Sequence, residues 1–342
     1  MIDEGAGARM GRAVQIEEPG ALHVLGAEAT PPGRGEALVE VAWSGICGSD
    51  LEVFHGTRPA EFVRYPVVPG HEWSGTVVRV GPDVDPGLVG RKVVGEGFRN
   101  CGRCTACREG DTSLCSAGYD ETGFTQPGAW ADHLRLPARL LHPLPDESDL
   151  RAAALLEPAA CMASAVLKAD LQVGESAAVI GGGTLGLLAT QLLAAAGAGH
   201  LVVVDPRADR AEPAKACGAT DFRAPDEIDG GFDVVLEAAG ASGTGRLAVR
   251  STRRGGRTVL TGIAPEEHEP LAPADLVGAA VTVHTVFGAS SRAWAHAVRA
   301  FATGHLDPAP LITHEFVLED AEQALRTLAD RSVPTGKVLL HP

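Results

Sequence analysis

The chain has 342 residues and a formal net charge of -15 at pH 7, and 45% of its residues are hydrophobic. This length exceeds the usual size of one hydrophobic core and predicts two domains. The acidic excess argues against a nucleic-acid partner and against binding to an anionic membrane, because phosphate groups would be repelled.

The first part of the chain predicts a compact β-rich domain. Residues 13–45 are typical of strands, and 36–43 is β-prone with partly alternating polarity. Two further strands are expected at 75–80 and 90–94. Frequent Gly and Pro without a helical period favour a β-rich fold over a helical one.

A short segment of this domain gathers the side chains that zinc favours. Cys47 offers a thiolate, His71 an imidazole and Glu72 a carboxylate. Ser49 adds a hydroxyl for proton transfer, and Asp50 a carboxylate that can orient the histidine. The segment predicts an open, catalytic zinc site.

Four cysteines then fall within fifteen residues, at Cys101, Cys104, Cys107 and Cys115. This spacing is typical of a closed, structural zinc site in a lobe over 100–116. Disulfides or buried thiols are the alternatives. The chain start lacks a basic-then-apolar segment, so we expect reduced thiols and a cytoplasmic location. A nucleic-acid-binding zinc ribbon is disfavoured by the acidic charge.

The second part predicts a dinucleotide-binding unit. An Ala-rich helix is expected over 150–168, followed by a buried strand at 176–180 and a second strand at 200–204. Between the strands lies the glycine fingerprint, which consists of Gly181, Gly183 and Gly186 and opens a helix. Strand, glycine loop, helix and strand form the βαβ context that this fingerprint requires.

The fingerprint predicts which groups contact the cofactor. The amides of Thr184 and Leu185 begin the helix and would face the phosphates. Asp205 ends the second strand, where a carboxylate binds the ribose hydroxyls and repels a 2′-phosphate, so NAD is favoured. Arg207 and Arg210 follow closely, and a nearby arginine can accept that phosphate, which keeps NADP as the less favoured alternative.

The run 177–204 carries no Asp, Glu, Lys or Arg, and its length alone would suggest a membrane helix. The triple glycine at 181–183 and the pair Gly197 and Gly199 divide it into shorter elements instead. We therefore expect no membrane partner.

The remaining sequence continues the alternation of strands and helices. Strands are expected at 232–237, 256–260 and 281–287, which predicts a doubly wound sheet with ligands at the strand carboxyl ends. A helix at 318–329 and a strand at 337–340 end the chain, and we expect them to return to the first domain.

These motifs together resemble the zinc-dependent medium-chain dehydrogenase/reductase family, which includes alcohol, sorbitol and threonine dehydrogenases. The likeness covers nearly the whole chain after Met10 and follows the family order of motifs. It implies an α/β fold with a GroES-like β-rich catalytic domain over 10–149 and a doubly wound Rossmann NAD-binding domain over 150–288. Residues 289–342 would return to the catalytic domain.

The resemblance implies a catalytic zinc held by Cys47 and His71. The third protein ligand would be Glu157 or Glu72, and Cys161 is a rival one helical turn further on. Alcohol dehydrogenases of the horse-liver type have cysteine where Glu157 falls, whereas polyol and threonine enzymes have glutamate. Glu157 therefore favours polyol-like substrates.

The resemblance also implies hydride transfer from an alcohol to the nicotinamide, with zinc lowering the pKa of the substrate hydroxyl and Ser49 accepting its proton. Many relatives finish the proton relay with a histidine where this chain has Glu52. Glu52, cofactor ribose with water, or a slower relay could replace it. Lys337 falls where relatives place a basic residue near the pyrophosphate.

Within the family, residues 65–75 look most like the 2-deoxy-scyllo-inosamine dehydrogenases of aminoglycoside antibiotic biosynthesis. This predicts a secondary alcohol or ketone on a polyol, cyclitol or aminocyclitol as substrate. The alternatives are a threonine-type amino-alcohol dehydrogenase and a non-catalytic NAD- and zinc-binding protein. The family also implies a homodimer or homotetramer, formed by edge pairing of 281–286.

Overall fold

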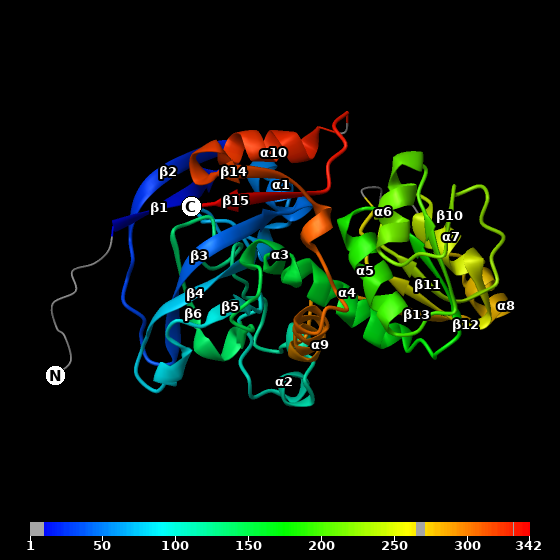
Figure 1. Ribbon diagram of the computed structural model, residues 1–342, viewed down its shortest axis with the longest axis horizontal. Helices are drawn as coiled ribbons and strands as arrows, with labels where there is room; N and C mark the ends of the chain where they lie inside the picture. The colour runs from blue at the N-terminus through cyan, green and yellow to red at the C-terminus, as the bar shows by residue number, and fades with distance from the viewer. Residues whose placement is uncertain (1–9, 265–270, 331) are drawn as a thin grey trace. The chain divides into compact units, whose positions relative to one another are not determined.

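The computed structural model describes residues 10–264, 271–330 and 332–342. Its contacts form two compact units (Figure 1): one extends to Glu157 and resumes at Pro308, and the other is Pro158–Asp307. The sequence interpretation set these limits at 149/150 and 288/289. The chain returns to the first unit later than expected. The Gln191 side chain exchanges two hydrogen bonds with the Asp307 backbone, at 2.9 and 2.7 Å, and so holds Asp307 in the second unit.

The first unit is built on a seven-stranded sheet with the order β14-β15-β3-β4-β5-β7, in which β6 also pairs with β3. A separate antiparallel ribbon joins β1 and β2. The strands are β1 Met10–Glu18, β2 Ala21–Glu28, β3 Glu36–Ile46, β4 Glu72–Val80, β5 Lys92–Gly95, β6 His133–Pro137, β7 Leu141–Pro143, β14 Ile312–Val317 and β15 Lys337–His341.

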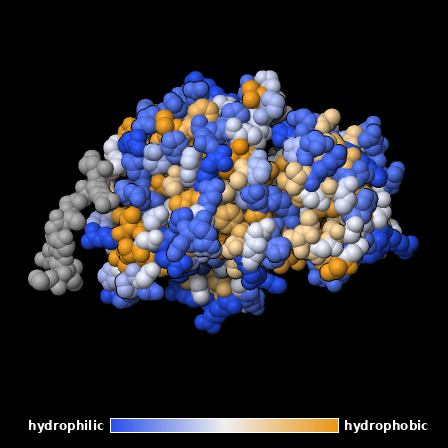
Figure 2. Space-filling model, in the orientation of Figure 1, coloured by the Kyte–Doolittle hydropathy of each residue, from blue (hydrophilic) through white to orange (hydrophobic). Residues whose placement is uncertain are grey.

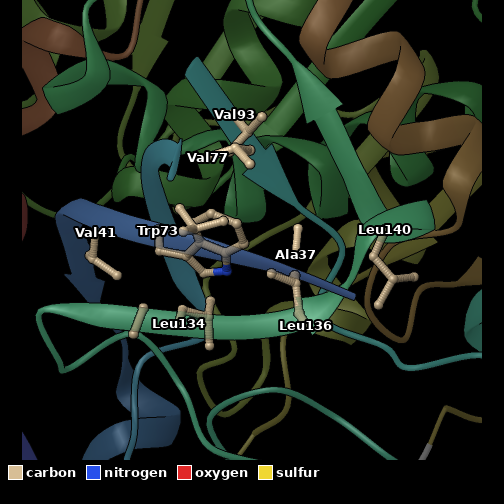
Figure 3. Close-up of a cluster of buried hydrophobic side chains, with 10 residues drawn as sticks. Ala37, Val41, Trp73, Val77, Val93, Leu134, Leu136 and Leu140 are labelled. Carbon is tan, nitrogen blue, oxygen red and sulfur yellow. The ribbon is translucent and has the colours of Figure 1, made fainter. Parts of the chain in front are cut away.

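The core of this unit forms around Trp73 of β4, which is 1% exposed. Figure 3 shows its indole beside β3, with Leu134 and Leu136 of β6 on one side and Val77 and Val93 on the other. Burial of this large ring fixes the start of β4, and with it the residue that precedes Trp73.

The C-terminal segment completes the same unit. Strand β15 pairs antiparallel with β3, so that Val338 lies opposite Ile46, and helix α10 (Ala321–Ala329) covers it. Ile46, Val338 and Leu325 share one buried cluster. Residues far apart in the chain therefore meet at the carboxyl end of β3.

The second unit is a doubly wound parallel sheet with the order β10-β9-β8-β11-β12-β13, which confirms the predicted fold class. Its strands are β8 Ser176–Ile180, β9 His200–Val204, β10 Asp221–Arg223, β11 Phe232–Glu237, β12 Thr252–Leu260 and β13 Thr282–Thr285. Its helices are α4 Leu156–Ala169 at the junction, α5 Thr184–Ala195, α6 Ala211–Ala216, α7 Thr244–Ser251, α8 Pro273–Ala279 and α9 Ser291–Ala302.

The charge-free run is divided as expected, into β8, α5 and β9. Among the described residues, no helix has the length and apolarity needed to cross a membrane. On the face drawn in Figure 2, hydrophobic residues form scattered patches among hydrophilic ones.

Asp233 of β11 ties three strands of this sheet together. Its carboxylate accepts hydrogen bonds from the amide and hydroxyl of Ser176, at 2.8 and 2.7 Å, and from Arg253, at 2.6 Å. Arg253 first, and then Ser176, lower the pKa of the Asp233 carboxyl to about 2. A lowered pKa means that its contribution to stability is present above the unfolded pKa and is lost as the pH falls through the folded one.

We therefore expect Asp233→Asn to lower the free energy of unfolding by about 1 kcal/mol near neutral pH, after allowance for solvent screening. The difference between variant and parent should shrink as the pH falls below about 4. Paired thermal unfolding at about pH 7 and about pH 3 measures it. A difference that stays constant across this interval would contradict the assignment.

Candidate functional site

The first cluster lies where the carboxyl end of β3 meets the start of β4. Cys47 follows β3 and caps helix α1 (Gly48–His55), and strand pairing sets Gly45 opposite Glu72. One ligand atom each from Cys47, His71 and Glu72 lies within 4.8 Å of the others. The structure thus brings together the three side chains predicted as the start of a metal site.

Asp50 lies beside Cys47 and His71 and helps to position both. It is fully buried, accepts the Cys47 N–H at 2.8 Å, and has Oδ1 3.6 Å from His71 Nδ1. Burial alone would lower the pKa of His71, but Asp50 and Cys47 raise it well above its usual value. Because Nδ1 faces Asp50, Nε2 is the nitrogen left for a metal.

The donor set fits zinc. Glu72 is 1% exposed and His71 5% exposed, and each offers one ligand atom within 4.8 Å of the other and of the Cys47 sulfur. Buried polar groups gathered this closely need a shared partner, and a cation can supply it. Sulfur, imidazole nitrogen and carboxylate oxygen together are the donors that zinc prefers.

Glu72 has a second partner in Lys337. The Lys337 ammonium is buried, donates to Glu72 Oε1 at 2.7 Å and to the Ile46 carbonyl at 3.0 Å. It lies here because β15 runs beside β3. The sequence analysis expected Lys337 near the pyrophosphate, and the structure pairs its ammonium with the Glu72 carboxylate.

Glu157 belongs to the same charge cluster. It lies in the first turn of helix α4, and desolvation raises the pKa of its carboxyl to about 7, with His71 opposing the rise and Glu72 and Glu121 adding to it. A metal cation beside it would favour the charged form. Glu72 lies in the three-residue cluster but is paired with Lys337, so both carboxylates remain candidates for the third ligand.

The predicted proton-transfer groups both lie on α1. Ser49 Oγ is 3.8 Å from Cys47 Sγ, so the hydroxyl is at the cluster. Glu52 is on the exposed side of the helix, and its carboxylate lies 3.4 Å from Arg58. Arg58 is a cation that cannot accept a proton, so this ion pair does not continue a proton relay from Glu52.

A group of residues near His71 was not predicted from the sequence. The Phe124 ring lies 4.6 Å from the His71 ring, and Arg58 lies 3.8 Å above Phe124. Arg58 donates to the Tyr119 hydroxyl at 3.0 Å, and Tyr119 donates to the Glu121 carboxylate. These residues follow no motif spacing, so only the folded chain reveals them.

The four-cysteine lobe forms the second metal cluster. The sulfurs of Cys101, Cys104, Cys107 and Cys115 lie within 4.8 Å of one another around helix α2 (Thr105–Glu109). The Cys107 amide and then the Ser116 amide lower the pKa of the Cys104 thiol to about 5, whereas desolvation and then Cys104 raise that of Cys107 to about 12. Four thiols, some ready to ionise, fit a structural zinc ion.

The glycine fingerprint lies at the carboxyl end of β8. Gly183 caps α5, and the first-turn amides of Thr184 and Leu185 are at the helix start as predicted. A side chain at Gly186 would collide with the Gly181 carbonyl, so the helix packs against this turn only with glycine there. This close packing is what the third glycine of the fingerprint provides.

Asp205 lies beside this turn and accepts the Gly182 N–H at 2.8 Å. Arg207 also binds it, with Nε 3.1 Å from Oδ1 and Nη2 3.2 Å from Oδ2. Although burial opposes the effect, Arg207 and Gly182 lower the pKa of the Asp205 carboxyl. Arg210 is buried against the same turn, where a Cβ on Gly182 would lie 3.1 Å from Arg210 Cβ.

Comparison with known proteins agrees with both halves of this description. The family pattern "Alcohol dehydrogenase GroES-like domain" matches residues 33–146, and "Zinc-binding dehydrogenase" matches 184–303. Sorbitol dehydrogenase of Bacillus subtilis (strain 168) is 31% identical over 90% of each chain. L-threonine 3-dehydrogenase of Yersinia enterocolitica is 30% identical over 90% of this chain and 93% of that protein.

A solved structure agrees with these matches. It is a putative zinc-binding dehydrogenase from Sinorhizobium meliloti 1021 bound to NADP, which superposes with a TM-score of 0.90 at 29% identity. The match covers 98% of this chain and 100% of the other.

Proposed function

Because the chain belongs to the zinc-binding dehydrogenases with a GroES-like alcohol dehydrogenase domain, we propose that it oxidises a secondary alcohol of a polyol, cyclitol or aminocyclitol with NAD. Membership confirms the predicted family and makes the chain an oxidoreductase acting on CH–OH groups, with zinc and NAD(P) as expected cofactors. The narrower likeness to 2-deoxy-scyllo-inosamine dehydrogenases stays a prediction.

The convergence of Cys47, His71 and Glu72 beside the Ser49 hydroxyl supports the proposal. Cys47 and His71, with Glu72 or Glu157, would hold zinc, which when bound lowers the pKa of a nearby hydroxyl. Ser49 Oγ would accept the proton of the substrate hydroxyl, while Asp50 keeps His71 oriented. The pairing of Glu52 with Arg58 favours ribose or water as the next proton acceptor.

The decisive experiment is a screen of zinc-loaded protein, with zinc content measured, against cyclitols, aminocyclitols, sugar alcohols and 3-hydroxy amino acids. NADH formation reports oxidation, and the matching ketones with NADH report reduction. We expect turnover on at least one polyol or aminocyclitol. Failure of the whole panel with both cofactors and full zinc would overturn the proposal and support the non-catalytic alternative.

A threonine-type activity is the second candidate, and the likeness to L-threonine 3-dehydrogenase favours it. The same screen separates the two, because 3-hydroxy amino acids carry a carboxylate beside the reacting alcohol and cyclitols do not.

We propose NAD as the preferred cofactor because the Asp205 carboxylate repels a 2′-phosphate. Arg207 partly offsets this charge through its two contacts with Asp205. Asp205→Asn is therefore expected to shift the NADH-to-NADPH affinity ratio toward NADPH by about 10- to 100-fold. Arg207→Ala should shift it the opposite way. Fluorescence titration measures both, and an unchanged ratio in both variants would contradict this role.

We further propose that the chain forms a homodimer or homotetramer and acts in the cytoplasm. The edge of β13 opposite β12 is free of strand pairing among the described residues, and Val277 on the neighbouring helix α8 is 79% exposed. Both features support a homodimer or homotetramer formed at this edge.

The absence of disulfides among the cysteines supports the reducing cytoplasm as the location of the protein.

A further inference from the structure

Glu237 is a buried side chain at the carboxyl end of β11, and the mechanism above does not use it. It is only 2% exposed. Its Oε1 accepts hydrogen bonds from the Ala239 amide at 2.8 Å and from the Gly240 amide at 2.7 Å. Its Oε2 accepts the Gly262 amide at 3.0 Å. A buried carboxylate is tolerated where such donors surround it, so these amides fix the Glu237 side chain in one position.

This carboxylate joins two loops that are separate in the chain. One loop follows β11 and contains Gly240, and the other follows β12, the neighbouring parallel strand, and contains Gly262 (Figure 1). The Thr261 amide and hydroxyl both donate to the Glu237 carbonyl, at 3.0 and 2.7 Å. A Cβ on Gly262 would lie 2.3 Å from the Gly240 nitrogen, so the loops touch through backbone atoms. Glu237 therefore bridges them where they are closest.

The bridged loops lie beside the glycine fingerprint. The Ala238 amide donates to the Ile180 carbonyl at 2.8 Å, which continues the pairing of β11 with β8. A Cβ on Gly181 would lie 2.9 Å from the Cα atom of Ala239, so the first glycine of the fingerprint lets its turn pack against the loop after β11. The backbone at the carboxyl ends of β8, β11 and β12 is therefore closely packed.

The strand order assigns these loops to one half of the cofactor. Strand β9 lies on one side of β8 and is followed by Asp205, which is expected at the adenosine ribose, whereas β11 and β12 lie on the other side. A dinucleotide binds across the carboxyl ends of such a sheet, with its pyrophosphate at the first βα turn and one mononucleotide on each side. The nicotinamide half would therefore lie over the loops that Glu237 bridges.

We propose that Glu237 is a positioning residue for the nicotinamide half of the cofactor. By joining the loop after β11 to the loop after β12, it holds their backbone in the arrangement that this half binds. Its effect passes through the amides of Gly240 and Gly262, which it accepts. This inference rests on the proposed NAD-dependent function and adds a residue to its cofactor site.

The test compares NADH with ADP, which keeps the adenosine half and both phosphates but lacks the nicotinamide nucleoside. Glu237→Gln preserves the shape of the side chain, but its amide group sets N–H donors against a backbone N–H. For the zinc-loaded protein we expect NADH binding to weaken by about 10-fold and ADP binding to stay the same. The exposed Glu212, changed to Gln, is the matched control and should keep both affinities. Titration calorimetry measures both ligands.

The split between the ligands separates positioning from a general loss of structure, which would weaken NADH and ADP alike. Equal weakening of both, or no change in NADH binding, would overturn the proposal. If the parent binds NADH but turns over no alcohol, the proposed function fails, and the two affinities still decide the role of Glu237. If Glu237→Gln does not fold, Glu237→Asp decides, because it withdraws the carboxylate by one methylene group and should also weaken NADH binding while sparing ADP.

Discussion

Cys47→Ser is expected to reduce alcohol oxidation by on the order of 10³-fold or more, because metal polarisation of the substrate is worth several kcal/mol. Cys47 supplies the thiolate of the three-residue cluster, and serine is a much weaker zinc ligand. NADH binding should be unchanged, since the glycine fingerprint lies in the other unit. The measurements are kcat/KM, zinc content and NADH titration.

Cys161→Ser is the matched control for this variant. Cys161 lies one turn after Glu157 on α4 and is the rival thiol ligand. If Cys47 is the ligand, the Cys161 variant keeps its zinc and most of its activity. Full activity of Cys47→Ser, or parallel losses in both variants, would contradict the proposed centre.

Cys104→Ser is expected to release one zinc ion per chain and to unfold the four-cysteine lobe locally. A structural zinc site supplies roughly 10–16 kcal/mol of binding free energy in small domains, and losing one of four thiolates removes a large part of it. The lobe contributes a short helix and no long strand, so little else holds it together. Protease cleavage within 100–116 should therefore accelerate sharply.

Ser113→Ala is the control in the same lobe, because it changes a side chain there without touching a thiol. It should keep both zinc ions and the parent resistance to protease. Metal analysis and limited proteolysis of the two variants give the comparison. A Cys104 variant with unchanged zinc content and unchanged cleavage would show that these sulfurs do not hold a metal.

The sequence predicted features whose chemistry is local. Cys101 to Cys115 come together within one lobe, and Gly181 to Gly186 fold as one turn, so spacing alone determines their geometry. Cys47 and Glu72 are further apart, yet β3 and β4 are neighbouring strands whose pairing brings them together. The antiparallel pairing of these two strands brings the residues together although a helix lies between them in the chain.

The sequence could not predict contacts that depend on distant segments. Lys337 was expected near the cofactor pyrophosphate, but pairing of β15 with β3 buries it against Glu72. Tyr119 and Glu121 lie in a loop without a motif, and their positions follow from Arg58. The expected helix over 150–168 is also interrupted, since α3 (Leu150–Ala153) ends before α4 begins at Leu156.

The ion pair between Lys337 and Glu72 spans 265 residues. A nascent chain leaves the ribosome from its N-terminus, so Glu72 emerges long before the lysine that neutralises it. The pair can form only after β15 has docked beside β3, so a chain truncated before Lys337 is expected to lack the charge that neutralises Glu72.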